Sequence, residues 1–186
     1  MKSLVSTVIL SNMKSARSFL ICSVVACLTA SAQISPSDQV FSKIVPALLL
    51  KTSVPLRVPT YLPALKKGDF HAIINSADQT GYIVVLGATP DCRGEHVCSY
   101  GALIGTDHPL RDLDFYVVSD RKAASVPLHH GITGNFYDTT CAAYSSDTLM
   151  VWTEGKYHYI IGLKAESKSN VIRAANSAID AADRWK

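Results

Sequence analysis

Short runs of alternating apolar and polar residues, joined by turns of hairpin length, constrain the fold of this chain most strongly. The clearest pair lies at 149–153 and 156–163, on either side of Glu154-Gly155. A turn this short joins antiparallel strands, because parallel strands need a long crossover connection. Similar runs, rich in β-branched and aromatic residues, lie at 70–75, 81–88, 98–105, 125–129 and 132–137. The pattern predicts an antiparallel sheet of six to eight strands.

Apolar residues at helical spacing flank the predicted strands on both sides. On the N-terminal side, Val40, Phe41, Ile44 and Leu48 predict a short helix that Pro46 limits or kinks. A longer C-terminal helix is expected from about Lys168, with one apolar stripe packed on the sheet. The stripe consists of Val171, Ala175, Ala178, Ala182 and Trp185. An antiparallel sheet with an N-terminal and a C-terminal helix is an α+β fold.

Three prolines mark the segment 54–63, which reads Val-Pro-Leu-Arg-Val-Pro-Thr-Tyr-Leu-Pro. Proline has no N–H group to donate to a sheet ladder, so within sheets it is confined to edges. We therefore expect this segment to form an edge strand or an extended arm.

Size and charge limit the class of protein. The chain has 186 residues, of which 48% are hydrophobic and 18% are charged, enough for one domain with a sizeable core. The formal net charge is +3, but Lys2, Lys14 and Arg17 account for it, and residues 33–186 carry 15 basic and 15 acidic side chains. Proteins that bind nucleic acids draw much of their affinity from a basic excess. The balanced charge of the folded part excludes nucleic acid as a partner.

The N-terminal residues 1–32 are predicted to be a signal peptide. Lys14 and Arg17 precede an apolar stretch centred on 19–28, which is too short for a membrane span. Small residues then end at Ala32, which predicts cleavage between Ala32 and Gln33. A polar linker is expected at 33–39 and a single domain at 40–186. The mature protein is expected to be periplasmic or secreted.

Two alternatives to this cleavage stay open. Val24-Val25-Ala26-Cys27 resembles a loose bacterial lipobox, in which Cys27 is acylated and anchors the protein in the cell envelope. Contact with a membrane is expected only under that alternative. The uncharged stretch 18–37 could also remain as an uncleaved anchor, although its Ser, Thr, Gln and Pro content argues against this.

Three cysteines follow the predicted cleavage site. Cys92 and Cys98 lie on the two sides of a predicted hairpin tip, and thiols oxidise in an exported protein, so we predict a disulfide between them. Cys141 is left as an unpaired thiol that is buried, free or used for an intermolecular bond.

A metal site is the alternative to this disulfide. Its ligands would be Cys92, His96 and Cys98, with Cys141 or one histidine of the pair His129 and His130 as a fourth, although the spacing is not that of a zinc knuckle. The two adjacent histidines fall on a predicted strand and are expected to point to opposite faces. No metal and no cofactor is expected in the favoured interpretation.

Familiar catalytic motifs do not occur in the sequence. It contains no G-x-S-x-G, no H-E-x-x-H and no glycine-rich loop that would cradle a phosphate. An exported hydrolase would need a nucleophile and a base that meet only in the fold. Candidates are Ser125 or Cys141 with His129 or His130.

Five motifs follow one another through most of the chain. They are the Leu-Pro arm at 54–63, the pair Cys92 and Cys98, Gly131-Ile132-Thr133-Gly134, Trp152 with Tyr157, and Ala175-Asn176-Ser177-Ala178-Ile179. In this order they resemble a family of small, exported, uncharacterised bacterial proteins. More distantly, the arrangement is similar to extracytoplasmic domains of unknown function on anti-sigma factors, which look like lipoprotein-carrier folds. The resemblance implies an antiparallel sheet that curves over helices, and it carries no catalytic residues over to this chain.

These observations predict an exported, non-catalytic domain of the cell envelope or the extracellular space that binds a protein or a small molecule. A carrier of apolar ligands or lipoproteins is one alternative, and the exported hydrolase is the other. A deep apolar cavity under the sheet would favour the carrier. A serine or cysteine hydrogen-bonded to a histidine in a cleft would favour the hydrolase.

Overall fold

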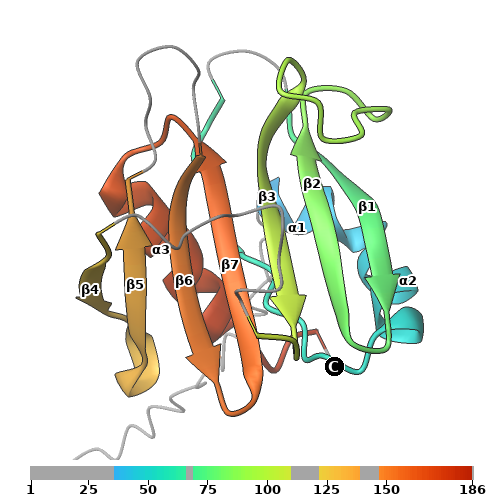
Figure 1. Ribbon diagram of the computed structural model, residues 1–186. Helices are drawn as coiled ribbons and strands as arrows, with labels where there is room; N and C mark the ends of the chain where they lie inside the picture. The colour runs from blue at the N-terminus through green and yellow to red at the C-terminus, as the bar shows by residue number, and fades with distance from the viewer. Residues whose placement is uncertain (1–35, 66–68, 110–121, 139–146, 186) are drawn as a thin grey trace, which may run out of the picture. The chain divides into compact units, whose positions relative to one another are not determined.

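Seven strands form one antiparallel sheet in the order β1-β2-β3-β7-β6-β5-β4 (Figure 1). The computed structural model describes residues 36–65, 69–109, 122–138 and 147–185. The strands are β1 (His71–Asp78), β2 (Gly81–Gly87), β3 (Ser99–Thr106), β4 (Ala124–Pro127), β5 (Thr133–Tyr137), β6 (Asp147–Glu154) and β7 (Tyr157–Lys164). Within these described residues, three α-helices complete the fold, and the predicted α+β class is confirmed.

Tight turns join β1 to β2 and β6 to β7. Gly155, with φ 61°, and Lys156 connect β6 to β7, and a left-handed backbone of this kind favours glycine. Between β1 and β2, Oδ1 of Asp78 accepts hydrogen bonds from the N–H groups of Thr80 and Gly81, at 2.8 and 3.1 Å. The central pairing of β3 with β7 is different, because it joins residues that lie far apart in the sequence.

The helix predicted from Val40 is two helices, α1 (Pro36–Ser42) and α2 (Val45–Lys51). Pro46 lies in the first turn of α2, where its missing N–H has no helical acceptor to lose. The expectation of a single helix that Pro46 limits or kinks is therefore wrong. Because α1 begins at Pro36, the last four residues of the expected linker 33–39 are helical.

The C-terminal helix α3 (Lys168–Asp180) begins where it was predicted. The side chain of Ser167 accepts a hydrogen bond from the N–H of Asn170 and caps its first turn. The residues that α3 buries are Val171, Ala174, Ala175, Ala178 and Ile179. Three of the five predicted stripe residues are among them, whereas Ala182 lies beyond the end of the helix and is half-buried.

The proline-rich segment 54–63 is an extended arm and not an edge strand. Its backbone forms hydrogen bonds with side chains of other elements, where the backbone of an edge strand would pair with a neighbouring strand. The N–H of Arg57 donates to Oη of Tyr82 (3.0 Å), and the N–H of Tyr61 donates to Oγ of Ser177 (3.1 Å). The carbonyl of Pro55 accepts from Oη of Tyr159 (3.1 Å), and the carbonyl of Val58 accepts from Nε1 of Trp185 (3.2 Å). These bonds satisfy polar groups of a buried segment that has no sheet partner.

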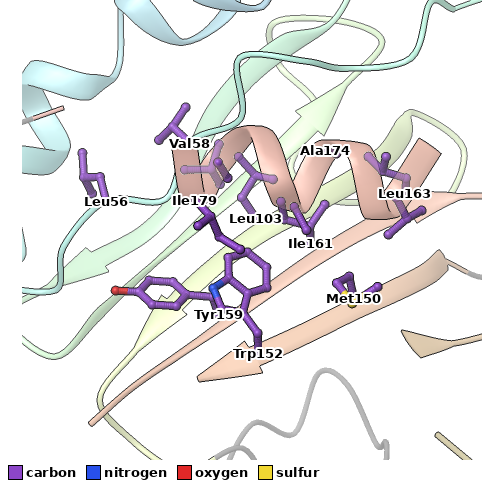
Figure 2. Close-up of a cluster of buried hydrophobic side chains, with 14 of the residues drawn as sticks. Leu56, Val58, Leu103, Met150, Trp152, Tyr159, Ile161, Leu163, Ala174 and Ile179 are labelled. Atoms are coloured by element: carbon purple, nitrogen blue, oxygen red, sulfur yellow. The ribbon is translucent and has the colours of Figure 1, made fainter. Parts of the chain in front are cut away.

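The main core fills the layer between the sheet and the helices, which lie behind the strands in Figure 1. Trp152 of β6 and Tyr159 of β7 stack with ring centroids 5.4 Å apart, and they are 2% and 1% exposed. Side chains from the arm, the central strands and α3 surround this pair in Figure 2; they include Leu56, Val58, Leu103, Ile161, Ala174 and Ile179. Burial of this apolar surface holds the arm and α3 on the sheet.

Candidate functional site

The Cys92–Cys98 disulfide closes the loop between β2 and β3. The two Cα atoms lie 5.8 Å apart, and Cys92 is 2% exposed. A Cβ atom added to Gly87 would lie only 2.6 Å from Cβ of Cys92, so the loop packs directly on the end of β2. The predicted disulfide is confirmed as a staple of this loop.

The alternative metal site at this loop loses its sulfur ligands. Cys92 and Cys98 are bonded to each other and offer no thiolate to a metal ion. The side chain of His96 is exposed, and its backbone carbonyl accepts a hydrogen bond from Nζ of Lys164. Of the three residues, only the imidazole of His96 remains as a potential ligand.

Several residues of the sequence analysis lie outside the described residues. These are Cys27 of the lipobox alternative, Ala32 and Gln33 at the predicted cleavage site, and Cys141. Their predicted roles stay predictions.

His129 and His130 lie in a 3₁₀ turn, η2 (His129–Gly131), between β4 and β5. The prediction that a strand continues through His129 is wrong, because β4 ends at Pro127. The chain then reverses through two residues with left-handed backbone, His130 at φ 55° and Gly131 at φ 73°. Since the alternation of a strand does not apply in such a turn, the two imidazoles are not directed to opposite faces of a sheet.

Both imidazoles meet one carboxylate on α3. Nδ1 of His129 lies 2.9 and 3.1 Å from the two oxygens of Asp180, and Nε2 of His130 lies 3.0 Å from Oδ1. All three side chains are accessible to solvent, with exposed fractions of 55%, 69% and 46% for His129, His130 and Asp180. We call these three residues the His-His-Asp cluster.

A backbone contact fixes the position of this turn on α3. The N–H of His129 donates to Oδ1 of Asn176 at 2.9 Å. Asn176 belongs to the Ala-Asn-Ser-Ala-Ile motif, and His130 directly precedes the Gly-Ile-Thr-Gly motif, so two motifs that are distant in sequence meet here. The sequence analysis did not identify Asp180, although this residue directly follows the Ala-Asn-Ser-Ala-Ile motif.

A surface groove of about 340 Å³ runs beside the cluster. Its walls come from three elements: the arm contributes Tyr61, η2 contributes His129, and α3 contributes Arg173, Asn176 and Asp180. The guanidinium of Arg173 lies over the ring of Tyr61, 3.9 Å from its centroid. Oη of Tyr61 donates to Oδ1 of Asn170 at 2.9 Å, which holds the ring against α3.

An ion pair joins the arm to the end of β6. Arg57 donates through two nitrogens to Glu154, whose Oε1 also accepts from Nε1 of Trp152 at 2.8 Å. Burial alone would raise the pKa of Glu154, but the hydrogen bonds from Arg57 and Trp152 outweigh it and hold the pKa below its ordinary value.

Among the residues that the structure describes, no hydrogen bond joins Ser125 to His129 or His130, and Cys141, the other candidate nucleophile, lies outside them. Ser125 is an exposed residue of β4. The hydrogen-bond partner of both His129 and His130 is a carboxylate instead of a hydroxyl or thiol group.

Comparison with protein-family models, with curated proteins and with solved structures finds no match to this chain. Among the residues that the structure describes, no helix combines the length and apolar character needed to cross a membrane.

Proposed function

We propose that the protein is an exported, non-catalytic binding module, and that it recognises its partner through the groove beside the His-His-Asp cluster. The observation that carries this proposal is the stacked pair of Tyr61 and Arg173 at the groove. Tyrosine and arginine dominate the energetic centres of protein interfaces. Here both are fixed before binding, since Tyr61 belongs to the bonded arm and Arg173 to a packed helix. A preformed surface loses less conformational entropy on association.

The packing of the core supports a binding module over a carrier. A carrier needs an enclosed apolar chamber, but Tyr82, Trp152 and Tyr159 fill the layer between the sheet and the helices. A second hollow of about 560 Å³ lies between α1 and the end of the arm. Its lining includes the exposed side chains of Gln39, Lys43 and Asp69, so it is open and mixed in polarity.

Export is supported by chemistry as well as by the N-terminal pattern. A disulfide persists in an oxidising compartment, and the Cys92–Cys98 bridge is compatible with an exported protein. We further propose the periplasm or the extracellular space as the location, and membership of the exported bacterial family that the five motifs resemble. Lipid anchoring through Cys27 is the alternative location.

Site-specific photocrosslinking in the native cells tests the proposed binding face. A photoreactive residue replaces Ser169, an exposed residue that lines the groove beside the stacked pair, in one variant and Lys51, an exposed residue of α2 on another part of the molecule, in a matched control. We expect a discrete crosslinked product from position 169 and none from position 51. Equal crosslinking at both positions, or none at position 169, would overturn the proposal.

A further inference from the structure

We infer that the groove beside the His-His-Asp cluster binds an acidic peptide, and that Arg173 holds a carboxylate side chain of this peptide. This assignment rests on the function proposed above and deepens it, because it names the chemistry of the partner that the same groove takes. Three properties of the groove support it: the open N–H groups of Arg173, the fixed position of its guanidinium, and a charge balance that suits one negative charge.

The N–H groups of Arg173 are open to a ligand. The central carbon of the guanidinium lies 3.9 Å from the ring centroid of Tyr61, so the group packs on the ring through its flat face. Among the described residues, no hydrogen bond or ion pair engages its N–H groups, and the side chain is exposed. The N–H donors along the edge of a guanidinium match the two oxygens of a carboxylate. Arg173 can therefore bind a carboxylate while it stays stacked on Tyr61.

Hydrogen bonds to α3 fix the ring on which this guanidinium is stacked. The N–H of Tyr61 donates to Oγ of Ser177 at 3.1 Å, and its Oη donates to Oδ1 of Asn170 at 2.9 Å. Both partners belong to α3, the helix that also carries Arg173. The ring and the guanidinium therefore stand on one packed element, and little side-chain freedom is lost when a ligand binds.

Asn176 adds a second donor to the same wall of the groove. It lies one helical turn beyond Arg173, so the two side chains are neighbours on α3. Oδ1 of Asn176 accepts the N–H of His129 at 2.9 Å, which fixes the orientation of the amide. Among the described residues, no acceptor is bonded to its Nδ2. This wall of the groove thus offers donors from two side chains, as an anionic ligand requires.

The charges of the groove suit a carboxylate better than a phosphate. Arg173 is the one lysine or arginine among the described residues that line it. Asp180 also lines it, about two turns further along α3, and accepts hydrogen bonds from His129 and His130. A carboxylate brings one negative charge, which Arg173 balances. A phosphate group carries about −1.5 to −2, and the excess would be repelled by Asp180.

The remaining surface of the groove favours a peptide over a small free acid. Its volume of about 340 Å³ exceeds what one carboxylate group fills. The ring of Tyr61 and the half-buried side chain of Ile172 add apolar surface beside Arg173. A peptide can cover this surface with the side chain next to its acidic residue, and burial of apolar surface contributes to its affinity.

Selection from a phage library of random short peptides tests this chemistry on the purified mature protein. We expect the selected peptides to share an acidic residue at one position, and we expect Arg173→Gln to abolish this preference. Lys51→Gln removes an exposed cation elsewhere and should leave the preference unchanged. Selected peptides without a shared acidic residue, or the same acidic preference in Arg173→Gln, would overturn the inference.

Fluorescence polarisation with one labelled peptide from this selection provides a second readout. Replacement of its acidic residue by the corresponding amide should weaken binding about tenfold or more. Arg173→Lys should have a similar effect, because lysine keeps the charge but lacks the planar pair of donors. Phosphoserine in place of the acidic residue should also bind more weakly. Full affinity of Arg173→Lys, or tighter binding of the phosphoserine peptide, would contradict the assigned carboxylate site.

The two proposals about the groove fail in different experiments. Peptides that lack an acidic preference would remove the carboxylate site, but a crosslinked partner at position 169 would still support the groove as a binding face. Absence of crosslinking at position 169 would instead remove the proposed function, whatever peptides the library yields.

Discussion

Arg57 and Glu154 form a two-pronged ion pair that joins the proline-rich arm to the end of β6. Nε of Arg57 lies 2.8 Å from Oε1 of Glu154, Nη2 lies 2.5 Å from Oε2, and the two side chains are 13% and 21% exposed. The guanidinium also lies 5.4 Å from the ring centroid of Tyr159. One arginine therefore connects the arm, the β6–β7 hairpin and the aromatic core.

Removal of the charge from Glu154 should destabilise the protein. Glu154→Gln keeps an acceptor for Nε1 of Trp152 but leaves the largely buried Arg57 without its counter-ion. Loss of one partner from a fully buried pair costs roughly 3 to 5 kcal/mol, so we expect about 2 kcal/mol here, measured by urea unfolding. Lys156→Gln is the matched control, because Lys156 is 70% exposed and pairs with Asp107 only at 3.7 Å. Equal effects of the two substitutions would contradict the assigned role of the pair.

The stability of the protein should depend on Glu154 at acid pH. Its pKa in the folded protein is lower than the ordinary value of 4.5, because hydrogen bonds from Arg57 and Trp152 outweigh the cost of burial. A carboxyl group whose pKa is lowered by folding stabilises the protein at pH values above its ordinary pKa. This stabilisation is lost as the pH falls from the ordinary pKa through the folded pKa. Unfolding free energies measured between pH 7 and pH 3 should therefore fall less steeply in Glu154→Gln. A steeper fall in that variant would show that the pKa shift has the opposite sign.

The packed face of α3 should respond to charge far more than its exposed face. Ala178 is 0% exposed, so Ala178→Asp buries an unpaired carboxylate and should lower the unfolding temperature strongly. Arg173→Ala removes an exposed contact with Tyr61, worth about 0.5 to 1 kcal/mol. Calorimetry of both variants compares the two faces, and equal unfolding temperatures would refute the packing described here.

Reduction of the Cys92–Cys98 bridge should lower the free energy of unfolding by an amount that depends on the length of the closed loop. For a closed loop of about seven residues, the chain-entropy relation gives roughly 2 to 2.5 kcal/mol. Thermal unfolding with and without a reductant measures this, and a Cys92→Ser/Cys98→Ser variant should match the reduced protein and be insensitive to the reductant.

Non-reducing peptide mapping should show the Cys92–Cys98 peptide and an alkylated Cys141. A bridge from Cys141 to either cysteine would contradict the hairpin staple.

The exported protein should begin at Gln33. Small residues precede this position after the apolar stretch, as signal peptidase requires. The intact mass of protein isolated from the native envelope or medium decides the question. A diacylated product that begins at Cys27 would instead establish lipid anchoring.

Alternation and turn residues predicted the local hairpins because both are properties of neighbouring residues. The pair β6 and β7 surrounds Gly155, and its strand bounds differ from the predicted ones by no more than two residues at each end. The pairing of β3 with β7 could not be predicted in this way. It depends on how two separate meanders meet in the core, which no local pattern encodes.

The candidate site was less accessible to prediction than the fold. The sequence analysis noticed His129 and His130 but placed them on a strand, where adjacent side chains point to opposite faces. The turn that they form depends on the left-handed conformation of His130, which has no clear sequence pattern. Asp180 reaches them from α3 through tertiary packing. The motifs at 131–134 and 175–179 lie beside the two segments that meet in the fold. The motifs alone do not predict that these segments contact one another.

The extended arm also determines when this protein can finish folding. Arg57 and Tyr61 belong to an early segment, and their backbone partners include residues of β2 and α3. A chain that leaves a ribosome or a secretion pore from its N-terminus exposes Leu56 and Val58 until the last helix has emerged. For that interval the arm lacks the partners that the C-terminal residues supply to its backbone, Oγ of Ser177 for the N–H of Tyr61 and Nε1 of Trp185 for the carbonyl of Val58.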